Sequence, residues 1–196
     1  GNAAGNNITF SAKLDGSTSG AEPVTLNAGT GGNVLFTQAV GSGARLGAIN
    51  ITNANDVTES AGITAASLTQ AAGQGTTTFN GAVNTNTATG VNLTGNKQTV
   101  NNAITTTAGG PVTFSNAGLL TLNGDITADG AVTQNGAGAV TIDTHRTITT
   151  TADAVGFATN VTLAKTGGTG LLTIDTTSGN AAGNNITFSA KLDGST

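Results

Sequence analysis

The chain has 196 residues, including 30 glycines and 6 phenylalanines, but no tryptophan, tyrosine, methionine or cysteine. Only 8% of the residues are charged, and the net charge of -4 comes from acidic and basic residues scattered singly. This composition excludes disulfides and thiolate metal sites, and it offers no basic patch for nucleic acid. No apolar run reaches the roughly 18 residues of a membrane helix, so we expect no membrane insertion by this segment. With few aromatic residues, the core must be thin and regular.

The two ends of the chain carry the same sequence. Residues 1–18 and residues 179–196 both read GNAAGNNITFSAKLDGST. Position 179 therefore repeats position 1. We interpret 1–178 as one long tandem repeat and 179–196 as the start of the next copy. The expected partners are neighbouring repeats of the same protein, arranged end to end.

A shorter period divides the long repeat. An apolar residue flanked by small polar ones returns about every 22 residues, which is a usual length for one coil of a solenoid. This spacing predicts about eight coils in each long repeat, every coil carrying an inward-facing anchor. The expected anchors are Phe10, Phe36, Val57, Phe79, Val100, Leu122, Ile142, Leu163 and Phe188.

Three short strands are expected in each coil. The first ends at the anchor and has a second inward apolar residue two positions earlier, and turn residues such as Asn80-Gly81 follow it. A second strand begins about four residues after the anchor, as at Val83, because period-two alternation resumes there. A third strand carries another apolar pair. The sequence thus predicts an all-β, triangular parallel β-helix. The third pairs are Val24 and Leu26, Ile49 and Ile51, Val91 and Leu93, Val112 and Phe114, and Leu172 and Ile174.

Residues on either side of the anchor should point outward and form a ladder of threonine beside a ladder of asparagine. We expect the threonine ladder to be interrupted at Leu35 and Asp56. Stacked parallel strands explain such ladders structurally, because threonine fits the pleat and asparagine amides bond along the stack. The alternative is a flat surface that contacts another solenoid, a glycan or ice, since threonine ladders occur on ice-binding solenoids. The residues are Thr78, Asn80, Thr99, Asn101, Thr121, Asn123, Thr141 and Asp143.

Candidate catalytic and metal-binding residues are few. The tightest cluster is Asp143, His145 and Arg146, which we interpret as a solvated corner because no second pair of carboxylates lies nearby in the sequence. Asp15-Gly16, Asp125 and Asp129-Gly130 resemble pieces of calcium loops, but the GGxGxD nonapeptide of calcium-binding β-rolls is absent. The sequence predicts no enzyme and no cofactor, and it gives isolated Ca²⁺ sites no support.

Segments such as NVLFTQAVGSGARLGAINIT, GTTTFNGAV and GGPVTFSNAGLLTLNGDIT resemble the strand repeats of very large bacterial surface proteins of the filamentous-haemagglutinin and autotransporter-passenger type. The resemblance covers the whole chain but lies in the coil pattern, so it transfers no binding residue. It implies a right-handed parallel β-helix that is secreted to the bacterial surface or beyond.

Two functions follow from these expectations. The first is a non-catalytic structural repeat of a long extracellular filament, sheath or stalk, with lateral self-association as a further contact. The second is the shaft or binding module of an adhesin that recognises a glycan or a host surface. The sequence favours the filament, because its six phenylalanines form no cluster on one face.

Overall fold

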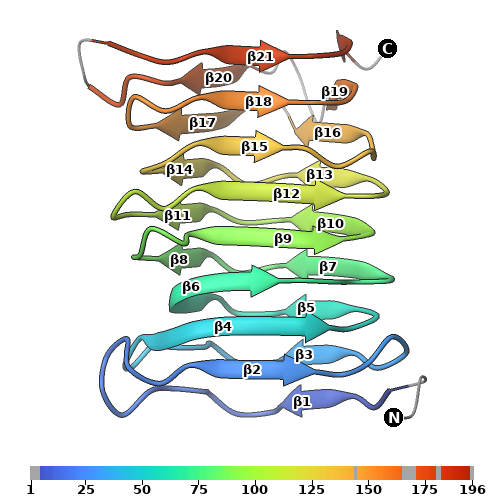
Figure 1. Cartoon of the computed structure of the whole chain (residues 1–196), viewed down its shortest axis with the longest axis vertical. Coiled ribbons are helices and arrows are strands. Elements are labelled where there is room, and N and C mark those ends of the chain that lie inside the picture. Colours follow the sequence, from blue (N-terminus) through green and yellow to red (C-terminus); the bar gives the residue numbers. More distant parts are fainter. Residues whose placement is uncertain (1–4, 144, 165–170, 180–181, 195–196) are drawn as a thin grey trace.

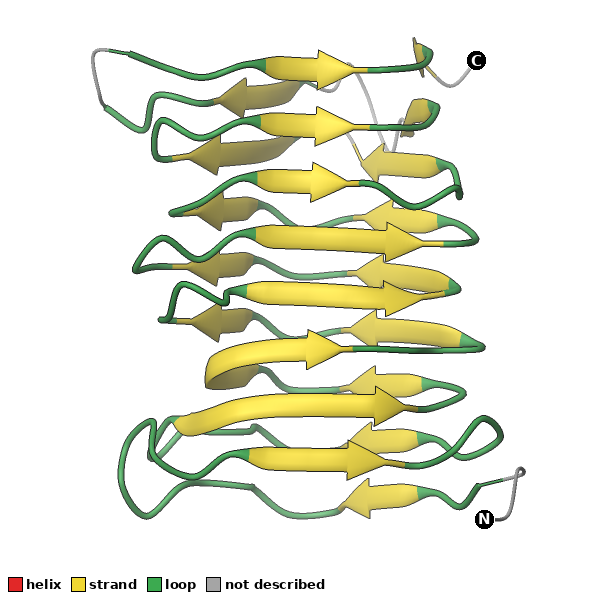
Figure 2. Cartoon of the chain, viewed as in Figure 1, coloured by secondary structure: helices red, strands yellow, loops and turns green. Residues whose placement is uncertain are grey.

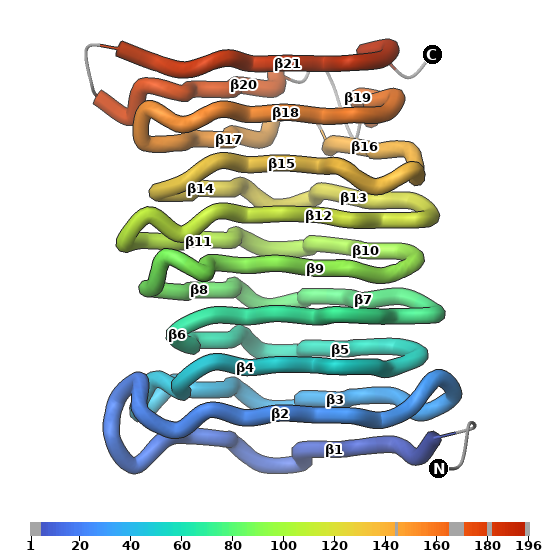
Figure 3. Tube along the Cα trace, in the orientation of Figure 1, coloured from blue at the N-terminus to red at the C-terminus, as the bar shows by residue number. Residues whose placement is uncertain are grey.

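The computed structural model of the chain describes residues 5–143, 145–164, 171–179 and 182–194. These residues form strands and loops but no helix (Figure 2). The chain winds into a β-solenoid of about 7 turns, spaced about 22 residues apart, with its termini at opposite ends of the stack (Figures 1 and 3). The predicted all-β solenoid is therefore confirmed.

Face one is a sheet of nine parallel strands, one from each pass of the chain. The first seven steps along it are regular. The last step, from Val161 to its partner Leu192, spans more of the sequence than any other, so the structure has about 7 turns of the expected spacing and not the eight coils predicted. The strands are β1 (Ile8–Phe10), β3 (Val34–Phe36), β5 (Val57–Glu59), β7 (Thr76–Phe79), β10 (Lys97–Val100), β13 (Leu120–Leu122), β16 (Val140–Asp143), β19 (Val161–Ala164) and β22 (Leu192–Gly194).

Face two is the second side of the triangle. It begins with two isolated bridges, from Leu14 to Val40 and from Val40 to Ile63. It then continues through the first half of β6 (Ile63–Gln70). The remaining strands are β8 (Val83–Thr85), β11 (Ile104–Thr106), β14 (Ile126–Ala128), β17 (Arg146–Thr150) and β20 (Leu172–Asp175).

Face three joins face two through β6, which bends around a corner. Ile63–Ala65 of β6 pairs with β8, whereas Leu68–Gln70 pairs with β9 on face three. Leu172 and Ile174 pair with β17 on face two, which corrects their predicted place as a third strand. The strands of face three are β2 (Val24–Asn27), β4 (Leu46–Asn53), β9 (Val91–Gly95), β12 (Val112–Asn116), β15 (Val132–Gln134), β18 (Val155–Phe157) and β21 (Ile186–Phe188).

The core is one cluster of aliphatic and phenylalanine side chains that runs through the turns. Strand alternation produces it, because the first and third residues of a strand such as Leu120–Leu122 are buried and the middle one is not. The expected anchors Phe36, Val57, Phe79, Val100, Leu122 and Ile142 are buried, and Phe10, Leu163 and Phe188 pack partly buried against them.

Two anchors differ from the expected register. Val57 is buried but pairs with Val34 and Thr77, so the position level with Phe36 and Phe79 belongs to Glu59. Val57 fits the anchor pattern because it is apolar, but it begins β5, and the anchor position lies two residues later, at Glu59. Phe188 does not lie on face one with Phe10: it pairs with Phe157 on face three.

Glu59 is a fully buried carboxylate, with 0% of its surface exposed. Its side chain turns into the corner between faces one and two. Oε1 accepts hydrogen bonds from the backbone N–H groups of Ala61 and Gly62, and Oε2 accepts one from Gly81 at 2.9 Å. A Cβ on Gly81 would lie 2.2 Å from the nitrogen of Gly62, so this corner requires glycine there. The corner thus supplies the polar partners that a buried carboxylate needs.

Other buried polar side chains also serve the corners. Gln134, which is 1% exposed, donates to the carbonyl of Gly136 at 2.8 Å and to Asn116 Oδ1 at 2.8 Å. Its own Oε1 accepts from the Ala158 backbone at 3.0 Å. Because turning backbone cannot join the strand ladders, such amides satisfy groups that would otherwise be buried without partners.

Candidate functional site

The threonine ladder on face one is longer than the sequence predicted. The registers pair Leu35 with Thr58 and Thr58 with Thr78, so the ladder is interrupted at Leu35 but not at Asp56. Asp56 lies just before β5 and is not part of the column. Six consecutive strands therefore present threonine at the same outward position, namely Thr58, Thr78, Thr99, Thr121, Thr141 and Thr162.

The asparagine ladder runs beside it and is hydrogen-bonded along the stack. Asn101 Nδ2 donates to Asn80 Oδ1 at 2.9 Å, and Asn123 Nδ2 donates to Asn101 Oδ1 at 2.8 Å. Asn101 thus accepts from Asn123 in the next coil and donates to Asn80 in the preceding one. Asp143 holds the following position in β16 and pairs with Ala164. The geometry matches the predicted stacking of amides.

Faces two and three carry similar columns, which the sequence prediction did not single out. Outward positions on all three faces are mainly threonine and asparagine, so the ladder of face one is not a distinctive chemical surface. Face two presents Thr64, Asn84, Thr105, Thr127, Thr149 and Asp175. Face three presents Thr25, Asn50, Thr69, Asn92, Thr113, Thr133, Gly156 and Thr187.

Aspartates at the corners hold adjacent coils together. Asp15 Oδ1 accepts from the backbone of Gly43 at 2.8 Å, and Asp56 Oδ1 accepts from Thr76 at 2.7 Å. Asp125 and Asp129 make the same kind of contact, to Thr147 at 2.9 Å and to Gly109 at 2.8 Å. The residues that resembled calcium loops therefore bind backbone N–H groups of the next or preceding coil. Among the described residues, no three Asp, Glu or His side chains are grouped so that they could hold a metal ion.

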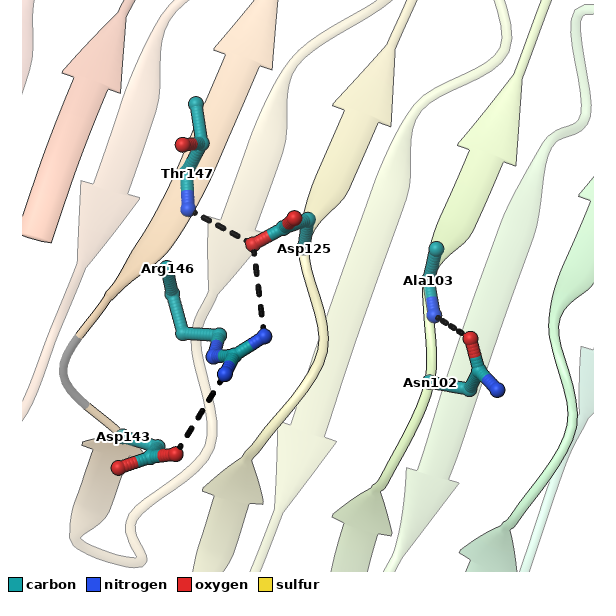
Figure 4. A network of polar contacts seen from close by, with 6 residues as sticks. All are labelled: Asn102, Ala103, Asp125, Asp143, Arg146 and Thr147. Carbon is teal, nitrogen blue, oxygen red and sulfur yellow. Dashed lines mark hydrogen bonds and ion pairs between the residues drawn. The ribbon is translucent and has the colours of Figure 1, made fainter. Parts of the chain in front are cut away.

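The cluster of Asp143, His145 and Arg146 lies at the corner between faces one and two. Figure 4 shows the Arg146 guanidinium between two carboxylates, 3.7 Å from Asp143 Oδ2 and 3.9 Å from Asp125 Oδ1. His145 is exposed and adopts a left-handed conformation, with φ at 67°. Asp125 also accepts a hydrogen bond from the backbone N–H of Thr147 in the next coil. Arg146 therefore balances the charge of a carboxylate that already links two coils. Ion pairs this exposed contribute less than about 1 kcal/mol each.

A hollow of about 420 Å³ opens on face one where Leu35 interrupts the threonine ladder. Leu35 is partly exposed there, and hydroxyl, amide and carboxylate groups surround it. Asp56 is the charged residue of the rim, and each of its oxygens accepts one hydrogen bond, from the backbone of Thr76 and from Asn55 Nδ2. The rim comprises Asn7, Thr9, Asn33, Val34, Asp56, Thr58, Thr76 and Thr78.

Comparisons of the chain with protein-family models, with curated proteins and with solved structures found no match. In the part of the chain that the structure describes, no helix is long and apolar enough to cross a membrane.

Proposed function

We propose that the chain is part of a non-catalytic structural repeat of a long extracellular filament, sheath or stalk, secreted by a bacterium or held at its surface. The observation that carries the proposal is the uniform stack. Nine strands follow one another on face one, and all three faces present mostly uncharged threonine and asparagine. Such a rod is extended by stacking more coils, because each coil contacts only its neighbours.

The neighbours in this proposal are further copies of the same repeat, joined end to end. Among the residues that the structure describes, the strands at both ends of the stack have a neighbour on one side only. Of the four exposed large apolar side chains in this part of the chain, three lie near the C-terminal end: Leu171, Ile186 and Leu192. An open edge with apolar side chains is unstable alone and favours another strand. The columns of threonine also allow lateral contact between rods, since they carry little charge to repel a neighbour.

The test is the length of a tandem array. Chains with two, four and eight copies of residues 1–178 are expected to form rods in electron micrographs, with contour lengths that grow in proportion to copy number. At about 4.8 Å per coil, eight coils would add roughly 38 Å for each copy. Fibre diffraction should give a meridional spacing near about 4.8 Å. Compact particles whose diameter barely changes from two to eight copies would contradict the filament.

The hollow around Leu35 favours a second candidate function, recognition of a glycan by the shaft of an adhesin. Its rim offers four threonine hydroxyls and the Asp56 carboxylate, whose oxygens each have a lone pair left, around a partly exposed aliphatic side chain. Neutral sugars bind to such combinations of polar rim and apolar floor.

Glycan arrays with the 196-residue chain test this second function. The chain is expected to retain a neutral oligosaccharide, and Asp56→Ala should lose that binding. Asp125→Ala is the matched control, because it also removes an aspartate that bonds the next coil but lies outside the hollow. An array on which the unmodified chain retains no glycan would rule the adhesin function out for this segment.

A further inference from the structure

The sequence shared by the two ends of the chain occupies different faces of the solenoid in its two copies. In the first copy, Ile8–Phe10 lies on face one against Val34–Phe36. In the second copy, the identical Ile186–Phe188 lies on face three against Val155–Phe157. Leu192–Gly194 then covers β19 on face one, although its counterpart Leu14 bridges to Val40 on face two. The second copy is therefore rotated by one side of the triangle.

We infer that residues 186–194 take one register at the end of a chain, the chain-end register seen here, and a different one, the array register, when another copy follows. In the array register the Ile-Thr-Phe strand binds the edge of β19 that β22 now covers. This inference rests on the proposed tandem filament and adds the register of its junctions. The partner is a second copy of the repeat, and binding it requires β21 to move from face three to face one.

Burial of apolar side chains on face three favours the chain-end register. Phe188 stacks on Phe157, with ring centroids 5.4 Å apart and planes 13° apart. Ile186 covers Val155, which is fully buried. If Ile186–Phe188 lay on face one instead, this coil would have only residues 176–185 for face three, and TTSGNAAGNN contains no apolar side chain larger than alanine. The exposed edge of the core would then lose its best cover.

Repulsion between two aspartates also favours the chain-end register. In the array register Leu192 would extend the column of Leu14 and Ile174, and Asp193 would lie directly opposite Asp175. The Thr177 hydroxyl and the backbone of Thr177 hold the pKa of Asp175 below its usual range, so this carboxylate is ionised at neutral pH. Like charges directly opposite each other on adjacent strands destabilise the pairing. In the chain-end register Asp193 lies opposite Thr162 instead.

When another copy follows, the array register becomes the favoured one. The first copy illustrates why. There Phe10 on face one stacks on Phe36 of the next coil at 5.0 Å. The next copy would bring the same Val-Leu-Phe strand over Phe188, and its coils would cover Ile186 and Leu192, which are now 46% and 47% exposed. Strands with neighbours on both sides gain ladder hydrogen bonds and apolar burial that an edge strand lacks. We expect these gains, in the register that continues the columns of the first copy, to outweigh one contact between carboxylates.

Engineered cysteine pairs test the inference, because the natural chain contains no cysteine. Gly156→Cys with Thr187→Cys reports the chain-end register, since these outward positions are paired and a Cβ on Gly156 meets no atom within 4 Å. Thr162→Cys with Thr187→Cys reports the array register. Strands about 4.8 Å apart bring paired positions within disulfide range. Each pair is placed in the present chain and in an extended chain that continues after Thr196 with residues 19–178.

The present chain should form the first disulfide and not the second, and the extended chain should lose the first and gain the second. Thr9→Cys with Leu35→Cys is the control that should form in both chains. An extended chain that keeps the disulfide between positions 156 and 187 would overturn the inference. Electron micrographs of the same extended chain separate the two proposals: a rod that keeps this disulfide contradicts only the register change, whereas a compact particle contradicts the filament.

Discussion

Replacement of Glu59 by leucine is expected to lower the free energy of unfolding by about 1–3 kcal/mol, even though leucine suits a position between Phe36 and Phe79. The carboxylate is fully buried and accepts hydrogen bonds from three backbone N–H groups. Of these donors, Gly81 is a buried residue, Gly62 is half-buried and Ala61 is exposed. Leucine removes the acceptor of all three donors. The buried N–H of Gly81 then costs about 1–3 kcal/mol, whereas the N–H of the exposed Ala61 can bond to water. Urea unfolding followed by circular dichroism measures the change.

Glu59→Gln separates the hydrogen bonds from the charge. Its one carbonyl oxygen replaces only part of the acceptor set, so the loss should lie between those of the leucine variant and the unmodified chain. Thr58→Val is the matched control, because it changes an outward residue of the same strand and should alter stability by less than about 0.5 kcal/mol. Buried ionic groups are sometimes replaced by apolar residues without loss. A leucine variant as stable as the original would place Glu59 in that class and contradict the expectation.

Alanine at Gly138 is expected to destabilise the solenoid by about 3 kcal/mol, the upper range for overpacking, or to prevent folding of the coils around it. A Cβ there would lie 1.6 Å from the carbonyl oxygen of Gly118 in the preceding coil. That oxygen belongs to backbone and cannot swing aside. The carbonyl of Gly138 also accepts from the Thr159 hydroxyl at 2.7 Å, so any shift of this corner breaks a further contact.

Gly156→Ala provides the matched comparison, since the same substitution is made where a Cβ meets nothing within 4 Å. Gly156 lies mid-strand in β18, and alanine should stabilise the chain by about 0.4–1 kcal/mol because it restricts the unfolded chain. Thermal unfolding of both variants checks the pair. Equal effects of the two substitutions would mean that inter-coil contact at Gly138 does not limit the choice of residue.

The sequence predicted most of face one, because Phe79, Val100, Leu122, Ile142 and Leu163 recur at nearly constant spacing with threonine before each. It misplaced the anchor of β5, because a search for apolar anchors selects Val57 and cannot recognise Glu59 in the core. Gly62 and Gly81, which follow Glu59 in the sequence, donate backbone hydrogen bonds to its carboxylate. They lie in two different coils, so the sequence around Glu59 does not show that they meet there. Long-range pairing of this kind is invisible in local sequence.

The place of Phe188 could not be predicted from its own neighbourhood at all. Residues 179–196 and residues 1–18 are identical, yet they lie on different faces. Local sequence therefore does not decide the face, and the strands available for pairing do. The corner aspartates were noticed in the sequence as acidic turn residues, but their contacts to the adjacent coil follow only from the stacking of coils.

The direction of the strand ladders decides how such a rod responds to force. All pairings between coils are parallel strand contacts along the stack, so their hydrogen bonds run along the long axis. A pull on the two ends is carried by every coil in series, and the outermost coil peels away first because its strands have a neighbour on one side only. Each coil of about 22 residues that peels away releases about 70 Å of extended chain. A tether made of these repeats lengthens in discrete steps and dissipates a sudden load coil by coil.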